Sequence, residues 1–337
     1  MVYQPEKRGS HAVGVTTLTE EPDSVHNRPA TIEVWYPATA GGKELDTFQP
    51  HSKIPILPQA AARDAEPVTG NGSLVLFSHG YGSHRRQSTY LCTHLASHGY
   101  VVCAPEHHGN TLTTFLGKDE VGIAPVPDEE TVIHRPLDVA RALTITKAWR
   151  GARGVCGGIG ICGHSYGGWT SLAVARTNPD ITAIGALASA GGIGSRWGEA
   201  LFSKLKLPWE DEKPALFITC SQDSLVPEST TKQLFDSYNG DKSWVSITGA
   251  DHFHFCDAGE FIHEWYRAME NNKHLPTMSK MAPIAELSPP KLAREVSQAL
   301  FVALFDYRLR GLDEAKSYLE NKEEALSKIG LDDATFA

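Results

Sequence analysis

Short apolar runs alternate with longer segments of helical spacing along most of the chain. Continuous apolar runs of about five residues are typical of strands that are buried on both faces of a parallel sheet. Such runs occupy residues 74–77, 100–105, 160–162, 181–188, 215–220 and 244–248. Helical patterns follow near 86–98, 136–150, 166–177, 228–238 and 257–269. This alternation predicts an α/β fold with a central, mostly parallel sheet flanked by helices.

The N-terminal part of the chain follows a different pattern. Residues 12–18 and 30–36 have the composition of extended segments. Residues 31–36 alternate polar and apolar side chains, which is typical of a half-exposed edge hairpin. Gly, Pro and polar residues dominate 38–72, which predicts a long surface excursion. No linker interrupts the alternation, so we predict one domain over residues 1–337. The expected insertions and extension are loops or caps at 38–72, 109–130 and 190–213 and C-terminal helices within 275–337.

A stripe of apolar residues at helical spacing lies in the C-terminal stretch, within residues 289–328. Its apolar positions are Leu292, Val296, Ala299, Leu300 and Leu304. Such a stripe usually packs on a core. An oligomer or partner contact is the alternative interpretation, which makes a homo-oligomer the one protein partner that we consider.

Residues 163–167 (G-H-S-Y-G) fit the nucleophile-elbow pattern G-x-S-x-G. In that motif a serine occupies a tight turn between a strand and a helix, and glycine relieves crowding two residues to either side. An apolar run precedes the motif here and a helical pattern follows it. We therefore predict that Ser165 is a nucleophile; a plain Gly-rich turn is the alternative.

A serine nucleophile needs a base and an orienting acid, which follow it along the chain in this architecture. Asp223 comes just after the apolar run ending at Cys220, at the carboxyl edge where ligands bind. We expect Asp223 to be the acid, with a helix-capping role as the alternative. Asp211 and Glu228 are weaker rivals, and Asp211 precedes its strand and should lie at the other edge.

His252 follows the last predicted strand and is our expected base. His254 is the competitor, and it lies farther from the end of that strand. A metal site built from His252, His254, His107 and His108 is a further alternative, but it lacks a ligand-spaced helix such as H-E-x-x-H. We therefore predict no metal and no cofactor.

The mechanism also needs N–H donors for a developing oxyanion. One donor is the backbone N–H after the nucleophile, which belongs to Tyr166, and the other comes from the loop after an earlier strand. The loop 78–81 occupies that place, and we predict the N–H of Tyr81. His79 and His164 flank the two loops, and we expect them to hold the loops by hydrogen bonds.

Composition narrows the range of partners. The 337 residues carry 31 basic and 40 acidic side chains, a formal net charge of −9, so nucleic acid is not an expected partner. No apolar run reaches transmembrane length, and the first residues lack the apolar core of a signal peptide. The six cysteines include no C-x-x-C pair and are too few for a disulfide scaffold. We therefore expect a cytoplasmic protein.

Several motifs together resemble serine α/β-hydrolases of the platelet-activating-factor acetylhydrolase and predicted dienelactone hydrolase group, and more distantly polyester cutinases. The resemblance covers roughly residues 10–270. It is carried by residues 32–37 (IEVWYP), 78–80 (SHG), 95–102 (LASHGYVV), 104–107 (APEH), 163–168 (GHSYGG) and 252–257 (HFHFCD). The last motif resembles H-x-x-F-x-D, whose first residue is the histidine of the family's triad, so the resemblance favours His252. True dienelactone hydrolases have cysteine where Ser165 stands, so their activity is not implied.

The expected function is a cofactor-free serine hydrolase that cleaves a carboxylic ester of a small soluble substrate through an acyl-enzyme. An amidase, lactonase, carbamate hydrolase or acyltransferase with the same triad is the alternative, and a ligand receptor with little turnover is a more distant one. Large aromatic residues are candidates for the substrate pocket: Trp169, Trp197, Trp209, Phe253 and Phe255. Segment 190–213 is a candidate lid.

Overall fold

The computed structural model describes residues 2–22, 27–39, 42–68, 72–152, 154, 157–195, 198–209, 213–269 and 281–336. Trp197 and Asp211 lie outside the described residues.

A ten-stranded sheet is the centre of the described structure, in the order β12-β11-β10-β9-β8-β6-β7-β2-β1-β5. The run from β11 to β7 is parallel, as the apolar pattern predicts, while β2, β1 and β12 pair antiparallel to their neighbours. A separate pair is formed by β3 (Asp46–Phe48) and β4 (Leu57–Gln59). The strands of the large sheet are β1 (Ala12–Glu20), β2 (Ala30–Ala38), β5 (Ala62–Arg63), β6 (Leu74–Ser78), β7 (Val101–Pro105), β8 (Ile159–His164), β9 (Ile181–Leu187), β10 (Ala215–Cys220), β11 (Lys242–Ile247) and β12 (Ala334–Phe336).

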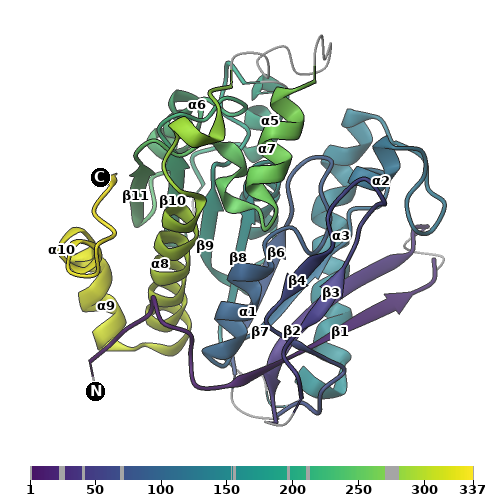
Figure 1. The fold of residues 1–337 in the computed structure, drawn as a ribbon, viewed down its shortest axis with the longest axis horizontal. Helices are drawn as coiled ribbons and strands as arrows, with labels where there is room; N and C mark the ends of the chain where they lie inside the picture. Colours follow the sequence, from purple (N-terminus) through teal and green to yellow (C-terminus); the bar gives the residue numbers. More distant parts are fainter. Residues whose placement is uncertain are drawn as a thin grey trace.

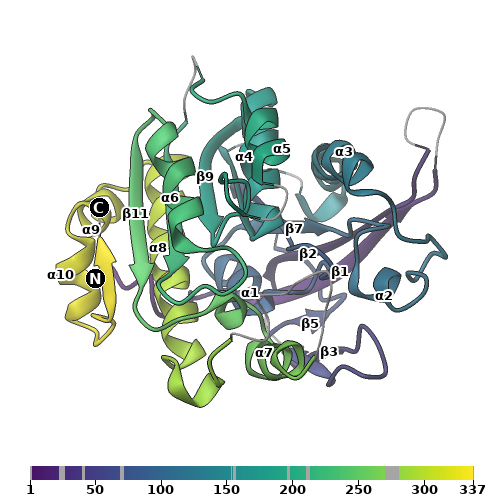
Figure 2. The ribbon, with the colours of Figure 1, turned by 90° about the horizontal axis from the view of Figure 1, so that it is seen from above.

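Helices cover both faces of this sheet (Figures 1 and 2). Side chains of α1 and α8 share one buried apolar cluster with the sheet, and side chains of α3, α4, α5 and α6 share the other. The helices are α1 (Thr89–Ser97), α2 (Leu112–Phe115), α3 (Asp128–Ala148), α4 (Tyr166–Thr177), α5 (Gly198–Leu205), α6 (Glu228–Ser237), α7 (Gly259–Arg267), α8 (Pro290–Arg310), α9 (Asp313–Glu320) and α10 (Lys322–Ser327). Short 3-10 helices are η1 (Arg150–Ala152), η2 (His252–Phe255) and η4 (Ile284–Glu286).

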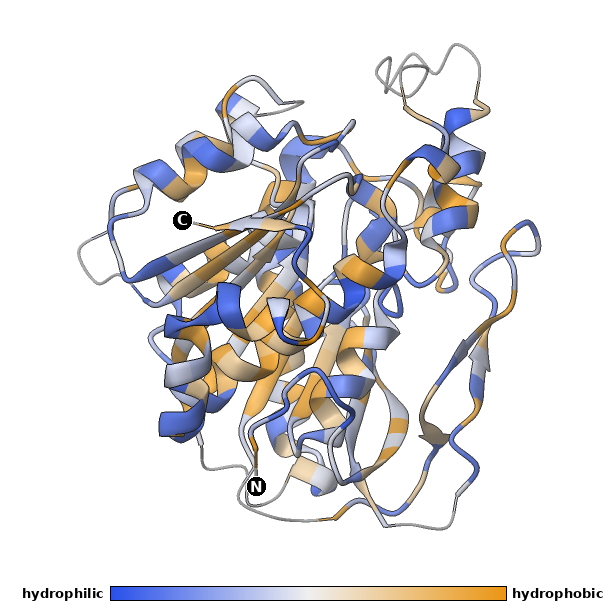
Figure 3. Ribbon diagram, turned by 60° about the vertical axis from the view of Figure 1, so that its left-hand side comes forward, coloured by the Kyte–Doolittle hydropathy of each residue, from blue (hydrophilic) through white to orange (hydrophobic). Residues whose placement is uncertain are grey.

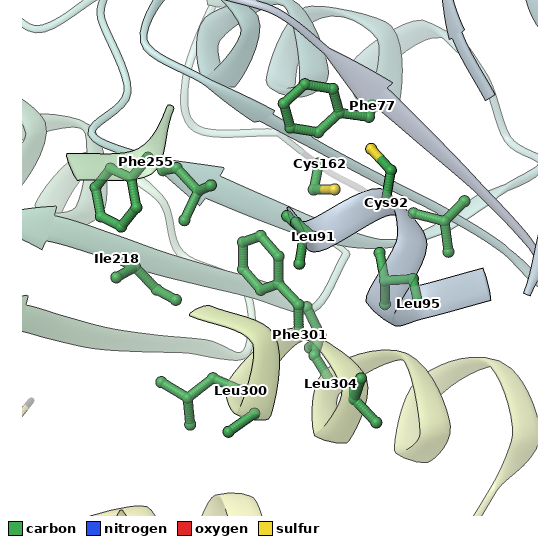
Figure 4. Close-up of a cluster of buried hydrophobic side chains, with 14 of the residues drawn as sticks. Phe77, Leu91, Cys92, Leu95, Cys162, Ile218, Phe255, Leu300, Phe301 and Leu304 are labelled. Atoms are coloured by element: carbon green, nitrogen blue, oxygen red, sulfur yellow. The ribbon is translucent and has the colours of Figure 1, made fainter. Parts of the chain in front are cut away.

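Helix α8 is part of the main core and not a peripheral extension. Its apolar side chains pack on the sheet and on α1 (Figure 4), and Phe301 and Phe305 have no exposed surface. The hydropathy colouring shows that apolar residues dominate the central strands (Figure 3). The C-terminal stripe is therefore core, as expected for Val296, Ala299 and Leu300, and it breaks at Gly311, whose φ of 71° ends α8 in a left-handed cap.

Three boundaries differ from the sequence-based expectation. Segment 38–72 is not wholly a surface excursion, because Gln59 is buried and accepts a 2.6 Å hydrogen bond from Trp35. Helix α3 begins at Asp128 and not near 136, since acidic residues favour a first helical turn, and it accommodates Pro136. The strand before His252, β11, was expected to be the last strand of the chain, but β12 follows it and pairs with it.

The five cysteines of the described chain are buried and unpaired. No described helix has the length and apolar character needed to cross a membrane.

Candidate active site

Ser165 occupies a strained turn between β8 and α4. Its φ of 58° lies in the left-handed region, and its backbone carbonyl accepts hydrogen bonds from Gly168 and Ala190. Two glycines make the turn sterically feasible. A Cβ on Gly163 would lie 2.3 Å from the carbonyl oxygen of Gly167, and a Cβ on Gly167 would lie 1.8 Å from that of Ser78. The expected elbow backbone is thus present, and glycine is required at both positions.

Asp223 and His252 form a direct hydrogen bond, with 2.8 Å between Nδ1 of the imidazole and Oδ2 of the carboxylate. The other carboxylate oxygen accepts from the backbone N–H groups of Leu225 and Val226, at 3.0 and 2.7 Å. Burial opposes protonation of His252, but the charge and hydrogen bond of Asp223 outweigh it, so the pKa of His252 is raised. Both carboxylate oxygens of Asp223 are therefore engaged, one by the imidazole and one by the backbone.

His254, the competing histidine, has a different set of partners. Its Nδ1 accepts from the backbone N–H of Asp251 at 3.1 Å, and its Nε2 donates to the carbonyl of Ser288 at 2.8 Å. Asp251 in turn caps η2 by accepting from the N–H of His252. Both ring nitrogens of His254 are thus engaged in holding the short helix that carries His252.

The other residues weighed from the sequence do not converge here. Glu228 lies in the first turn of α6. His107 and His108 bind Asp138 and Asp119, at 3.0 and 2.8 Å. Within the described ranges, no three His, Cys, Asp or Glu side chains are grouped to hold a metal ion.

Gln87, just before α1, connects three loops at the site. Its side-chain oxygen accepts from the N–H of Gly80 at 2.8 Å, and its amide nitrogen donates to Nδ1 of His164 at 3.0 Å. Nε2 of His164 then donates to the carbonyl oxygen of His252 at 3.1 Å. The backbone carbonyl of Gln87 also accepts from the N–H of Asp257 at 2.9 Å. The side-chain amide of Gln87 therefore joins the loop after β6 to the elbow, and its backbone carbonyl binds the loop after β11.

Asp257 docks the segment after His252 onto the N-terminus of α1. Ser88 is the N-cap residue but makes no capping bond with its side chain. The carboxylate of Asp257 instead accepts from the N–H of Thr89 at 2.8 Å and from that of Tyr90 at 3.1 Å. Carboxylates are favoured at helix N-termini, so this cap fixes the two segments together.

The loop after β6 runs against the elbow. A Cβ on Gly80 would lie 3.4 Å from Cβ of Ser165. The rings of Tyr81 and Tyr166 are 6.1 Å apart between centroids, so the residues with the two expected oxyanion donors are neighbours. His79 holds the loop, because its Nδ1 donates to the carbonyl of Gly80 and its Nε2 accepts from the N–H of His107. Burial lowers the pKa of His79, consistent with this neutral form.

A buried serine–histidine–aspartate chain lies behind this loop. Ser78 Oγ is 2.9 Å from Nε2 of His107, whose Nδ1 is 3.0 Å from Oδ2 of Asp138. The exposed fractions of Ser78 and His107 are 0% and 1%, so no substrate reaches them. Arg135 also donates to Ser78 Oγ, at 3.2 Å. We therefore interpret this series of hydrogen-bonded side chains as structural support for the loop 78–81.

The aromatic residues predicted for the pocket occupy several places. Phe253 lies edge-on to the His252 ring at 5.7 Å and remains partly exposed. Phe255 is fully buried against His164, and Trp169 is buried with its Nε1 bonded to the carbonyl of Leu201. Trp209 packs on Tyr238, in the cluster beneath α6. Of the four described candidates, only Phe253 is both partly exposed and in contact with the histidine.

Gln87 and Arg135 are site residues that the sequence reasoning missed. Neither carries a local signal, because their partners are far away in the sequence. Asp257 belongs to the H-x-x-F-x-D motif, so its capping role had a signal that was not interpreted.

Replacing Gln87 with leucine tests the connection between the loops. The variant keeps the side-chain volume but leaves the N–H of Gly80 and Nδ1 of His164 without this partner. A buried unsatisfied polar group costs about 1–3 kcal/mol, so we expect a lower free energy of unfolding in denaturant titration, together with slower ester turnover. Gln298→Leu, which removes one hydrogen bond to Tyr90 on α1, is the control. Equal stability and activity of the two variants would contradict the assigned role.

Comparison with known proteins supports the architecture. The model of the family "Platelet-activating factor acetylhydrolase, isoform II" matches residues 59–137. A ferulic acid esterase from Streptomyces cinnamoneus superposes with a TM-score of 0.65 and 23% identity, over 92% of this chain and 93% of that one. It is one of 931 solved chains with significant similarity, so the fold alone selects no substrate. No curated protein sequence gives a significant match. The predicted fold and resemblance are confirmed: the chain has an α/β-hydrolase fold, and residues 59–137 match the platelet-activating factor acetylhydrolase family.

Proposed function

We propose that the chain hydrolyses a carboxylic ester of a small substrate with a triad of Ser165, His252 and Asp223. The 2.8 Å hydrogen bond between His252 and Asp223 carries this proposal, because it fixes the tautomer that leaves Nε2 as the basic nitrogen. The strained turn at Ser165, with the glycines that permit it, supplies the second argument. The matched family model gives independent support for an ester hydrolase.

The reaction that follows from this arrangement has two halves. His252 accepts the hydroxyl proton of Ser165 as Oγ attacks the carbonyl carbon, and the carbonyl electron pair moves to oxygen. The N–H groups of Tyr81 and Tyr166 bind that oxyanion, and the charge of Asp223 stabilises the imidazolium. The intermediate expels the alcohol, which receives its proton from His252. A water molecule then attacks the acyl group with His252 again as base, which releases the acid and regenerates Ser165.

The same groups could open an amide, lactone or carbamate, or pass the acyl group to an acceptor other than water. Product analysis separates these reactions. We favour the ester because it has the better leaving group and because the family match points to an ester hydrolase. A cytoplasmic location remains a prediction.

Labelling with a fluorophosphonate tests the triad directly. We expect one adduct by intact mass on the wild type. The control Ser171→Ala, which removes a buried serine of α4, should give the same adduct. Ser165→Ala and His252→Ala should give none, and Ser165→Ala should lower kcat by about 10⁴-fold or more. An adduct on folded Ser165→Ala would assign the nucleophile elsewhere.

The pH dependence of hydrolysis follows from the raised pKa of His252. Only the neutral imidazole can accept the proton of Ser165, so kcat/KM should rise with pH. Its inflection should lie above the usual histidine value of 6.5. Asp223→Asn removes the carboxylate charge and should move that inflection downward, while Asp332→Asn, an exposed site, should leave it in place. An inflection at or below 6.5 in the wild type would refute the assignment of His252 as base.

Aromatic rings near the proposed triad favour an aromatic acyl group. Phe253, next to His252, stacks on Tyr266, with 5.0 Å between centroids and 10° between planes. Phe115, whose exposed fraction is 45%, lies 5.2 Å from Tyr81, the residue with one of the expected oxyanion donors. Partly exposed rings of this kind offer faces on which a planar substrate can stack.

A pair of esters with the same leaving group tests this preference. In Phe253→Leu and Phe115→Leu, kcat/KM for p-nitrophenyl benzoate should fall about 2- to 10-fold more than for p-nitrophenyl cyclohexanecarboxylate, since ring pairs contribute about 0.5–1.5 kcal/mol beyond area. Phe336→Leu, on the edge strand β12, is the control. Equal losses for the two esters would mean that the rings contribute only apolar surface.

A further inference from the structure

Arg135 of α3 lies beneath the loops that carry the two expected oxyanion donors. Its side chain has no exposed surface. The guanidinium carbon is 4.7 Å from the centroid of the Tyr166 ring, so the cation faces the first residue of α4. One of its nitrogens donates to the carbonyl of His79, two residues before Tyr81. Arg135 therefore contacts both sides of the expected oxyanion hole.

All hydrogen-bond partners that the described structure gives to this guanidinium are uncharged. Burying a charge is costly unless its donors find acceptors, and here they do. The acceptors are the carbonyl oxygen of His79, Ser78 Oγ at 3.2 Å, Asn110 Oδ1 at 2.7 Å and Thr170 Oγ1 at 3.0 Å.

The positive charge of Arg135 is therefore not cancelled by a direct ion pair. Asp138, one turn along α3, is instead 3.0 Å from Nδ1 of His107 and 3.5 Å from Arg28. Burial lowers the pKa values of His79 and His107, so both rings are neutral. Burial also lowers the pKa of Arg135 to about 10, which still leaves it charged at neutral pH.

We propose that Arg135 is a positioning residue of the oxyanion hole, whose buried charge also stabilises the negative oxygen of the tetrahedral intermediate. This inference rests on the proposed serine-hydrolase function. The hydrogen bonds to Ser78, His79 and Thr170 fix the loop 78–81 against α4, which sets the distance between the two donor N–H groups. In a site screened from water, a fixed cation acts on a developing anion without any cost of reorganisation. The ester carbonyl is neutral before attack, so this stabilisation belongs to the transition state and should affect kcat more than KM.

Substitutions at Arg135 separate the charge from the hydrogen bonds. With p-nitrophenyl acetate, Arg135→Met should lower kcat about 10- to 100-fold and change KM less than about threefold. Arg135→Lys keeps the charge and should recover most of that loss. Phenylboronic acid, which forms a tetrahedral anion on a catalytic serine, should bind Arg135→Met more weakly by a similar factor. Arg141→Met, a buried arginine of the same helix that binds the carbonyl of Glu21, is the control with unchanged kcat.

Asn110→Asp tests the same inference without removing the arginine. The new carboxylate replaces the amide oxygen that lies 2.7 Å from the guanidinium and forms an ion pair with nearly unchanged shape. If the charge acts on the oxyanion, this variant should lose activity about 10-fold or more while its melting temperature is unchanged or higher. A role limited to packing predicts unchanged activity, so this variant decides the question even if Arg135→Met does not fold.

The outcomes distinguish the inference from the function on which it rests. Loss of kcat in Arg135→Met and Asn110→Asp, with rescue by lysine, supports the inference. Wild-type kcat in folded Asn110→Asp, or equal losses in the lysine and methionine variants, overturns it while leaving the triad intact. If wild-type protein and Ser165→Ala hydrolyse the ester equally slowly, the proposed function is overturned and the inference with it.

Discussion

The buried residue Gln87 holds together three loops that come from distant parts of the chain, two through its side chain and one through its backbone carbonyl. Its amide engages Gly80 and His164, and its carbonyl engages Asp257. The sheet delivers each loop to the same edge because parallel strands end there, but a sheet edge alone sets positions only coarsely. Catalytic geometry needs positions within fractions of an ångström. The buried amide supplies that precision, since its oxygen and its nitrogen each hold a different loop.

A polar layer of this kind is tolerated only where every member is satisfied. Neutral histidines carry much of it: His79 and His164 each use one ring nitrogen as donor and the other as acceptor. Burial keeps them neutral, which is why they can bridge a donor and an acceptor. His252 is the exception, because Asp223 raises its pKa. The neutral histidines His79 and His164 therefore hold the loops, whereas His252 is the histidine proposed to transfer protons.

Local patterns were sufficient to predict the parallel strands, the elbow at Ser165 and the pairing of Asp223 with His252. These features have short-range causes: apolar runs, glycines that relieve crowding, and strand ends. Arg135 and Gln87 escaped prediction because they look like ordinary polar residues of helical segments and acquire meaning only through partners far along the chain. Helix α8 was underestimated for a related reason, since a stripe of apolar residues does not say which surface it covers.

The late position of α8 in the chain has a consequence for synthesis. Apart from the edge strand β12, the strands of the sheet have all been synthesised by residue 247, whereas α8 is complete only at Arg310. Until then the apolar face that this helix covers stays open to solvent, and exposed faces of nascent chains are aggregation-prone. The nascent polypeptide therefore passes through a stage in which all three proposed triad residues have been made but the core is incomplete.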